Sequence, residues 1–472
     1  MTAAAFNRVT PQLVERLREL VGADCVHIDD ESLLLHACDE TEDLVFRPEV
    51  VVVPRTAEGV AHTMRLATEY RVPVTPRGAG TGLSGGALPV HGGLVLSTKN
   101  LNRIIEIDRE NLMAVVEPGV ITQVFQDAVE AQGLFYPVDP ASRGSCFLGG
   151  NLAECSGGPR AVKYGVTKDF VTGIEAVLPN GNRVRHGGKL LKNVTGYNLT
   201  QLIVGSEGTL AVVTKIYFRL LPLPRHRTML LVPFNSLEEP ARAVPAIMHA
   251  GVVPSVLEFM ERDAVEITER HLGKSFPHAD AAAHLMIELD GNDEGVIQRE
   301  AERVAEIVLE HGATDVLVAD TDAKMGELWS MRRAFGAAVK SESIYKEEDT
   351  VVPRNQLVAL LQGVKEIAAR HGLRTVCYGH AGDGNLHVNI LKMDMTEERW
   401  NSALDPAIRE IFALTVKLGG LISGEHGIGY VQKDYMPLAY SREEIALMRA
   451  LKKAFDPLGI LNPGKMLPDE DQ

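Results

Sequence analysis

The stretch Pro76–Ala87 constrains the fold of this chain most, because five of its residues are glycine. Residues 80–85 read Gly-Thr-Gly-Leu-Ser-Gly and match the G-x-G-x-x-G pattern of a dinucleotide-binding turn. That turn needs a strand before it and a helix that opens from its last glycine. The alternation at Val72 and Val74 predicts the strand, but glycine and proline recur too densely after Gly85 for a helix. We therefore place the glycines in a loop between two strands.

This glycine loop, residues 76–87, is suited to bind an anion. Because glycine has no Cβ, backbone N–H groups can turn toward a phosphate at close range. A mobile surface loop is the alternative explanation, but such loops are usually more polar and less flanked by apolar segments. We interpret the glycine loop as a diphosphate cradle.

A second glycine-rich region follows in the same part of the chain. The pairs Gly149-Gly150 and Gly157-Gly158 lie in an apolar stretch, and Lys163-Tyr164-Gly165 and the sequence Gly-Ser-Glu-Gly-Thr-Leu at 205–210 come after it. Glycine pairs in an apolar segment let a flat ligand lie against the backbone. Tight packing of turns explains any single pair equally well. Together with the glycine loop, the segments favour an extended cofactor channel.

The composition narrows the class of protein. A chain of 472 residues is long for one domain, so two or three are expected. The net charge of -15 argues against nucleic acid or an anionic membrane surface as a partner. The five cysteines include no C-x-x-C pair, which excludes the usual spacings of a disulfide framework, a thiolate zinc site and an Fe–S cluster. A reducing compartment fits this pattern.

The predicted elements change in character along the chain. Thr10 followed by Pro11 predicts the start of a helix. Residues 94–220 are rich in predicted strands, with one helix expected at about 122–132. After the proline-rich stretch 221–224, longer helices alternate with short strands, as in a separate α+β domain. We expect no signal peptide, because residues 1–21 lack an apolar core and a cleavage site. We expect no membrane span, because no run of about 18 apolar residues occurs.

A group of histidines marks the second domain. His380 and His387 flank a turn between two predicted strands, and His387 shares one strand face with Asn389. Further along the chain, Glu425-His426 stands between glycines. Two histidines and a glutamate make an open three-ligand metal site that suits Zn²⁺, and also Mn²⁺ or Fe²⁺. A structural role stays open, because the chain has 15 histidines and such pairs also arise by chance.

Taken together, segments 76–87, 149–158, 163–165 and 205–210 resemble the FAD-binding domain of the vanillyl-alcohol oxidase and p-cresol methylhydroxylase superfamily. Within it, the chain is similar to the FAD subunit of glycolate oxidase, to D-lactate dehydrogenases and to D-2-hydroxyglutarate dehydrogenases. The resemblance implies an α+β fold. A two-part FAD-binding domain of the p-cresol methylhydroxylase type would be joined to a C-terminal α+β substrate or cap domain with an antiparallel sheet.

The implied domain division has four parts. These are an N-terminal helical segment (1–45), the FAD-binding domain (46–224), the substrate-binding cap domain (225–440) and a C-terminal segment (441–472) that returns to the FAD domain.

The resemblance also implies where FAD binds. Covalent members of the superfamily carry a histidine in the first glycine loop, but here Thr81 occupies about that place, so we expect non-covalent FAD. The implied cofactor-binding residues are Pro76, Arg77, Gly78, Ala79, Gly80, Thr81, Gly82, Ser84, Gly85, Pro140, Ser142, Cys146, Gly149, Gly150, Asn151, Glu154, Ser156, Gly157, Tyr164, Gly165, Glu207, Gly208 and Asn462.

The same resemblance implies that the group formed by His380, His387, Glu425 and His426 is the active site. His380, His387 and Glu425 are implied to bind a divalent metal, with zinc expected and manganese or iron as alternatives. Asn389 is implied to contact substrate, and His426 to be the catalytic base. A metal on the substrate hydroxyl lowers its pKa, and a histidine can take the proton.

Two cations are implied to bind the substrate carboxylate. Arg332 and Lys346 lie where the hydroxyglutarate enzymes carry their substrate arginine and lysine. Both could equally be solvated charges on a helix face. Gly336 stands where those enzymes have threonine, and this difference favours a smaller acid such as D-lactate or glycolate.

The predicted function is an FAD-dependent, metal-assisted oxidation of a D-2-hydroxy acid to the 2-keto acid, with hydride transfer to flavin N5. Electrons would pass to an external acceptor: an Fe–S subunit, an electron-transfer flavoprotein, a cytochrome or a quinone. The alternatives are a D-2-hydroxyglutarate or D-malate dehydrogenase, a non-redox FAD enzyme and an electron-relay FAD subunit. We expect a homodimer in the cytoplasm, with or without attachment to the inner membrane through a partner.

Overall fold

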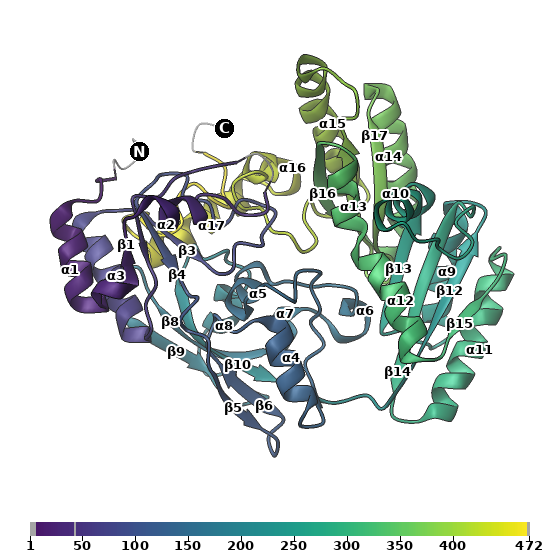
Figure 1. The fold of residues 1–472 in the computed structure, drawn as a ribbon, viewed down its shortest axis with the longest axis horizontal. Helices are drawn as coiled ribbons and strands as arrows, with labels where there is room; N and C mark the ends of the chain where they lie inside the picture. The colour runs from purple at the N-terminus through teal and green to yellow at the C-terminus, as the bar shows by residue number, and fades with distance from the viewer. Residues whose placement is uncertain (1–5, 42–43, 470–472) are drawn as a thin grey trace. The chain divides into compact units, whose positions relative to one another are not determined.

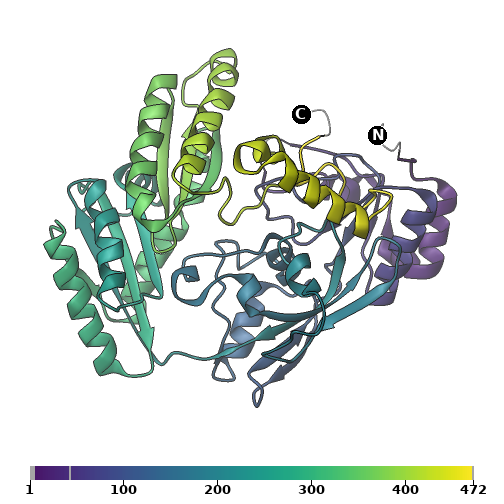
Figure 2. The same cartoon turned by 180° about the vertical axis from the view of Figure 1, so that it is seen from behind.

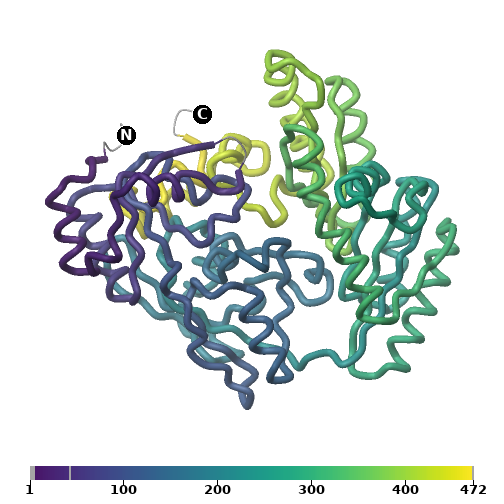
Figure 3. The backbone as a smooth tube through the Cα atoms, in the orientation of Figure 1, coloured from purple at the N-terminus to yellow at the C-terminus, as the bar shows by residue number. Residues whose placement is uncertain are grey.

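A computed structural model describes residues 6–41 and 44–469, which form two compact units (Figure 1). Unit 1 contains the stretches Met1–Ser156, Val166–Leu223 and Glu425–Gln472. Unit 2 contains Gly157–Gly165 and Pro224–Gly424. The chain therefore passes between the units four times, as the backbone trace in Figure 3 lets the reader follow.

This division differs from the expected one in two places. The segment 157–165 belongs to unit 2, where Lys163 Nζ lies 2.6 Å from Asp290 Oδ1. The stretch 425–440 belongs to unit 1, where the Glu207 carboxylate accepts hydrogen bonds from its backbone. Of the expected terminal segments, residues 1–5, 42–43 and 470–472 lie outside the described residues.

The first sheet of unit 1 is built around a parallel core. Strands β2, β4 and β3 are parallel, and β1 adds to β2 antiparallel. In sheet order they are β1 (Val26–His27), β2 (Val50–Val52), β4 (Leu94–Ser97) and β3 (Val74–Arg77). The helices of this region are α1 (Pro11–Val21), α2 (Asp30–Leu35) and α3 (Ala57–Tyr70), with the short 3-10 helix η1 (Ala23–Cys25). Leu13 and Leu17 of α1 pack with Val60 and Met64 of α3 in one buried core.

Three predictions about unit 1 can be compared with these elements. The Thr10 hydroxyl accepts a hydrogen bond from the Leu13 amide (3.2 Å) and caps α1, as predicted. The loop between β3 and β4 contains no helix, which confirms that the glycines do not open one. The chain end returns to this sheet: Leu461 forms a parallel bridge to Val74, and helix α17 (Arg442–Phe455) precedes it.

The second sheet of unit 1 is antiparallel. Its strands, in order, are β5 (Ile104–Asp108), β6 (Met113–Val116), β10 (Val212–Arg219), β8 (Val171–Val177) and β9 (Arg183–Gly187). A two-stranded pair consists of β7 (Leu134–Phe135) and β11 (Leu221–Pro222). The remaining helices of unit 1 are α4 (Thr122–Glu130), α5 (Leu148–Glu154), α7 (Thr167–Phe170), α8 (Leu199–Ile203), η3 (Lys433–Tyr435) and α16 (Met436–Ala439).

The prediction of a single helix within 94–220 is wrong, because short helices follow α4. Helix α5 includes the Gly149-Gly150 pair that glycine propensity argues against. Glycine is needed in this helix because the backbone packs closely: a Cβ on Gly149 would lie 2.5 Å from the Cβ of Pro118. Tertiary contact therefore outweighs local propensity at this position.

Unit 2 is a seven-stranded antiparallel sheet with helices on both faces. In sheet order its strands are β15 (Leu317–Ala319), β12 (His226–Phe234), β14 (Ala283–Gly291), β13 (Val256–Glu261), β17 (Arg374–His380), β18 (Asn385–Leu391) and β16 (Tyr345–Val351). Helices α10 (Arg262–Leu272), α12 (Asp322–Arg333) and α13 (Phe335–Glu342) share one apolar core with the sheet. The predicted antiparallel sheet of this domain is confirmed.

The other helical layer of unit 2 is seen in front of the sheet in Figure 2. It consists of α9 (Glu238–His249), α11 (Glu294–Glu310), α14 (Leu357–His371) and α15 (Glu397–Lys417). The short elements α6 (Ala161–Tyr164) and η2 (Arg354–Gln356) complete the unit. Among the described residues, no helix combines the length and apolar character needed to cross a membrane.

Candidate active site

Two glycine segments of unit 1 lie against each other. A Cβ added to Gly78 would lie 3.7 Å from the backbone N and Cα of Gly150, so the glycine loop and the start of α5 are in contact. At Gly82 and Gly150 an added Cβ would meet nothing within 4 Å. The backbone at these two glycines therefore borders open space.

A buried cation stands at the base of the glycine loop. Arg77 is 8% exposed, and its Nη1 has no hydrogen-bond partner among the described residues. Its guanidinium lies against Gly80, where an added Cβ would be 2.2 Å from Nη2. Burial lowers the pKa of Arg77 below its ordinary value, and the nearby Asp39 carboxylate opposes that shift. The Ser84 hydroxyl in the same loop is also without a described partner.

The other residues implied to bind cofactor divide between the units. Asn151 lies in unit 1, where its amide donates to the Thr122 hydroxyl (2.6 Å). Gly157, Tyr164 and Gly165 lie in unit 2, where the Tyr164 hydroxyl donates to Asp290 Oδ2 (2.7 Å). The members found in unit 1 are Pro76–Gly82, Ser84, Gly85, Pro140, Ser142, Cys146, Gly149, Gly150, Asn151, Glu154, Ser156, Glu207, Gly208 and Asn462.

The two histidines of unit 2 meet across neighbouring strands. His380 ends β17 and His387 lies in β18, and the imidazole centroids are 5.2 Å apart at an interplanar angle of 87°. Both side chains are buried. The predicted strand–turn–strand that brings these histidines together is confirmed.

A buried glutamate that the sequence prediction missed lies beside His380. Glu258 of β13 pairs opposite His380 and is fully buried. Its Oε1 is 2.5 Å from His380 Nδ1 and its Oε2 is 2.5 Å from Arg332 Nη2. Burial raises the pKa of Glu258, but the charges of His380 and Arg332 outweigh burial and hold the pKa below its usual range. A lone acid inside the apolar strand 256–260 was the available sequence signal.

Arg332 lies on the same face as the histidines but is already paired. Its guanidinium stacks over the ring of Tyr378, with Cζ 4.9 Å from the centroid, and contacts Glu258. Its Nε has no partner among the described residues. The structure thus places Arg332 on the sheet face that carries His380 and His387. The Glu258 carboxylate balances its charge, and its Nε–H has no described partner.

Strand register separates the other two predicted substrate residues. Asn389 lies on the face of His387, and its amide donates to the Val376 carbonyl (3.2 Å). Lys346 pairs with Ile390, so alternation along β16 turns it to the opposite face. Glu347 pairs with Asn389 instead, and its Oε1 lies 3.6 Å from His387 Nδ1. The structure therefore brings an acid, and not the lysine, beside this histidine.

A second buried acid, Asp349, fixes the end of unit 2. It accepts hydrogen bonds from the Asn385 amide (2.6 Å) and from the Gly424 backbone N–H (2.8 Å), and its Oδ1 lies 3.6 Å from His387 Nδ1. A Cβ on Gly424 would lie 2.4 Å from Asn385 Nδ2, so only glycine fits there. Glu425 and His426 are the next two residues of the chain.

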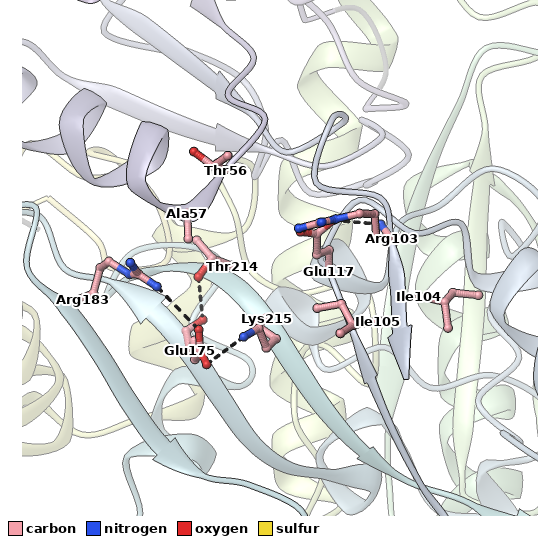
Figure 4. A pocket seen from close by; sticks show the side chains of 10 residues that line it. All are labelled: Thr56, Ala57, Arg103, Ile104, Ile105, Glu117, Glu175, Arg183, Thr214 and Lys215. Carbon is pink, nitrogen blue, oxygen red and sulfur yellow. Dashed lines mark hydrogen bonds and ion pairs between the residues drawn. The ribbon is translucent and has the colours of Figure 1, made fainter. Parts of the chain in front are cut away.

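A hollow of about 510 Å³ on the five-stranded sheet of unit 1 is not a candidate site (Figure 4). Its charged side chains pair with one another: Lys215 Nζ is 2.9 Å from Glu175 Oε1, and Arg103 Nη2 is 2.7 Å from Glu117 Oε1. No predicted site residue is among those that line it.

Two family models match the chain. One described as "FAD binding domain" matches residues 48–187, and one described as "FAD linked oxidases, C-terminal domain" matches residues 223–466. The chain belongs to the FAD-linked oxidases.

This FAD-linked oxidase is 40% identical over 459 residues to the glycolate oxidase subunit GlcD of Bacillus subtilis, and the match covers 97% of both chains. It is 37% identical over 475 residues to the D-lactate dehydrogenase of Anaerostipes hadrus, with 99% of both chains covered. The solved structure of p-cresol methylhydroxylase with substrate bound matches 98% of this chain and 97% of that one, with a TM-score of 0.80 at 19% identity. The predicted α+β fold, family and class of enzyme, an FAD-linked oxidoreductase, are confirmed.

The residues of unit 1 fit the cofactor of this family. A diphosphate is anionic and needs N–H donors at close range. Open glycine backbone at Gly82 and Gly150, the unpartnered Nη1 of Arg77 and the Ser84 hydroxyl are donors of this kind. These groups would hold the diphosphate part of FAD.

Proposed function

We propose that this FAD-linked oxidase converts a D-2-hydroxy acid, with D-lactate or glycolate favoured, to the 2-keto acid. The names of the two relatives contain glycolate and D-lactate, and both match nearly the whole chain. Bound FAD would supply the hydride acceptor, and an external partner would take the electrons.

We propose further that His380, His387 and Glu425 hold a divalent metal, zinc in the first place and Mn²⁺ or Fe²⁺ as alternatives. One observation carries this assignment: His380 Nδ1 lies 2.5 Å from the buried Glu258 carboxylate, with His387 beside it. Metal-binding histidines usually donate their second ring N–H to a carboxylate, which fixes the tautomer. In this arrangement Nε2 of His380 is the ligand atom. The metal would polarise the substrate hydroxyl.

The remaining groups would orient the acid and take its proton. His426 would accept the hydroxyl proton, since a neutral imidazole is a good base near neutral pH. Asp349 holds the Gly424 amide and so fixes the backbone from which Glu425 and His426 continue. Arg332 Nε and the Asn389 amide would face the substrate carboxylate.

Arg332 also favours the second candidate, a dehydrogenase of D-2-hydroxyglutarate or D-malate. In this alternative the Arg332 Nε–H, which has no described partner, would bind the carboxylate distal to the hydroxyl and not the one beside it. The Glu258 carboxylate already balances the guanidinium charge, however, so the single-carboxylate acids are preferred.

The metal assignment is tested by the double variant His380→Ala/His387→Ala. We expect the purified wild-type protein to contain about one metal ion per chain and the variant almost none, while its FAD content is unchanged. His371→Ala is the matched control, because His371 pairs with Glu410 on the surface of the same unit. A double variant that keeps the wild-type metal content would contradict the assignment.

The substrate is tested by anaerobic mixing of the oxidised protein with D-lactate, glycolate, D-malate and D-2-hydroxyglutarate. Bleaching of the flavin absorbance should be fastest with D-lactate or glycolate. Faster bleaching by a dicarboxylic acid would select the second candidate. Bleaching by none of the four would favour a non-redox FAD enzyme or an electron-relay subunit.

Non-covalent FAD and an external acceptor complete the proposal. Thr81 stands in a glycine loop without histidine, so acid denaturation should release the flavin from the protein. Because the cysteines include no C-x-x-C pair, the acceptor would be an Fe–S subunit, an electron-transfer flavoprotein, a cytochrome or a quinone. A homodimer in the cytoplasm, with or without a membrane-attached partner, is part of the same proposal.

A further inference from the structure

The backbone just beyond His426 is bound by a carboxylate of unit 1. Glu207 Oε1 accepts a hydrogen bond from the Ile428 N–H (2.8 Å), and Glu207 Oε2 accepts one from the Gly429 N–H (2.7 Å). Two successive amides thus converge on one carboxylate. Hydrogen bonds of this charged kind are among the stronger ones in proteins.

Glu207 is itself held in an unfavourable conformation. Its φ is 50°, in the left-handed region that residues with a Cβ rarely adopt. Its N–H donates to the Ala153 carbonyl (2.9 Å), and its carbonyl accepts from the Asn462 amide (2.8 Å). Backbone strain that neighbours maintain in this way is typical of residues with a functional task.

A second carboxylate reaches the same point of the loop. Gly427 has a φ of 81°, and a Cβ there would lie 2.2 Å from Glu154 Oε2 and 3.0 Å from Glu207 Oε1. The positive φ and the two carboxylates both favour glycine at this position. The residue that follows His426 is therefore fixed by shape as well as by hydrogen bonds.

The next residues bind the glycine loop. The Ser84 carbonyl accepts hydrogen bonds from the N–H groups of Tyr430 (2.8 Å) and Val431 (3.2 Å). From the chain end, the Met466 N–H donates to the Gly429 carbonyl (2.8 Å). Segment 427–431 is thus seated on the same loop whose open glycines fit the FAD diphosphate.

From these contacts we infer that Glu207 is a positioning residue for His426 and not a ligand of FAD. Its carboxylate fixes the amides two and three residues beyond the base, and so sets the course of the backbone that carries the imidazole. Asn462 supports Glu207 in this role, although the family resemblance had suggested a cofactor contact for both. The inference rests on the proposed function, which makes His426 the base.

Hydrogen exchange of the FAD-loaded protein in the absence of substrate tests, without any activity measurement, whether the Glu207 carboxylate holds segment 427–431. In Glu207→Gln, one of the two backbone N–H groups would face the NH2 of the new side chain, which cannot accept a hydrogen bond. The amides of segment 427–431 should therefore exchange at least about tenfold faster than in the wild type. Glu117→Gln is the matched control, because Glu117 is a buried acid of unit 1 whose carboxylate accepts from the Arg103 N–H. Unchanged exchange in Glu207→Gln would overturn the inference.

The FAD-loaded protein tests the positioning role. In Glu207→Gln, FAD affinity should be retained, flavin reduction by D-lactate should slow by about tenfold or more, and the pH profile of that rate should shift. A wild-type rate and profile in spite of faster exchange would overturn the role. If Glu207→Gln does not fold, Gly427→Ala provides the same test, because its Cβ would push against both acids. A wild-type reduction rate in His426→Ala would refute only the assignment of His426 as the base. The exchange experiment would still show whether Glu207 holds segment 427–431.

Discussion

At the scale of single residues, the buried acids organise the candidate site. Glu258 joins His380 to Arg332, and Asp349 joins Asn385 to the Gly424 backbone. The sequence prediction concentrated on histidines and cations because those side chains bind metals and carboxylates directly. The partners of such groups lie on other strands, and only the register of the sheet brings them close.

We predict that Glu258→Ala destabilises unit 2 strongly. Removing one partner of a buried ion pair leaves Arg332 uncompensated, which costs about 3–5 kcal/mol in the free energy of unfolding. Tryptophan fluorescence during urea unfolding measures this in unit 2, because the chain has two tryptophans, Trp329 and Trp400, and both lie there. Glu306→Ala, which breaks an exposed pair with Arg303 in α11 of unit 2, should cost under about 1 kcal/mol. An equal loss in both variants would refute the prediction.

At the scale of elements, alternation and capping made the local predictions reliable. The start of α1 at Thr10-Pro11 and the hairpin that carries His380 and His387 were predictable from the sequence. The placement of Lys346 was not, because its face depends on pairing between β16 and β18. Helix α5 was missed because the packing of Gly149 against Pro118 is a tertiary contact.

Strand β14 carries a histidine that should make unit 2 sensitive to acid. His284 is fully buried, its Nε2 lies 3.2 Å from the Pro277 carbonyl, and burial lowers its pKa from 6.5 to about 4. Between these pH values the unfolded chain binds more protons than the folded one, so stability is lost as the pH falls. From pH 7 to pH 5 this contribution amounts to about 2 kcal/mol.

His284→Gln should remove that part of the pH dependence. Glutamine stays neutral and can still donate to the Pro277 carbonyl. Urea unfolding followed by tryptophan fluorescence at pH 7 and pH 5 should show a smaller loss for the variant than for the wild type. His249→Gln, at the end of α9, serves as the control. Equal losses in wild type and His284→Gln would contradict the prediction.

At the scale of the whole molecule, each unit is built from stretches that are separated in the sequence, because the chain passes four times between the units. The change from unit 1 to unit 2 between Leu223 and Pro224 lies inside the proline-rich stretch 221–224, where a boundary is predicted. The passage through 157–165 could not be predicted, because it depends on Asp290 in a distant strand, which contacts both Lys163 and Tyr164. The glycines at 157 and 165 suggested a cofactor loop instead.

Loss of the ion pair between Lys163 and Asp290 should make segment 157–165 open more often. We predict that Lys163→Met makes chymotrypsin cleavage after Tyr164 about tenfold faster, because the partly buried pair with Asp290 is lost. Mass spectrometry of a digestion time course measures the cleavage. Lys189→Met, which removes ion pairs to Glu106 and Asp108 in unit 1, should leave that rate unchanged. Identical rates in Lys163→Met and wild type would show that the pair does not hold the segment.

We propose that FAD held by the glycine loops oxidises a 2-hydroxy acid, while the histidine group binds the acid and takes its hydroxyl proton. Anaerobic single-turnover reduction of the bound flavin by D-lactate or glycolate tests it most directly, with the wild type compared to His426→Ala. We predict that the wild type bleaches and that His426→Ala, with its FAD still bound, bleaches about 10²–10⁴-fold more slowly. If neither acid bleaches the wild type, or if His426→Ala reacts at the wild-type rate, the proposed reaction is wrong.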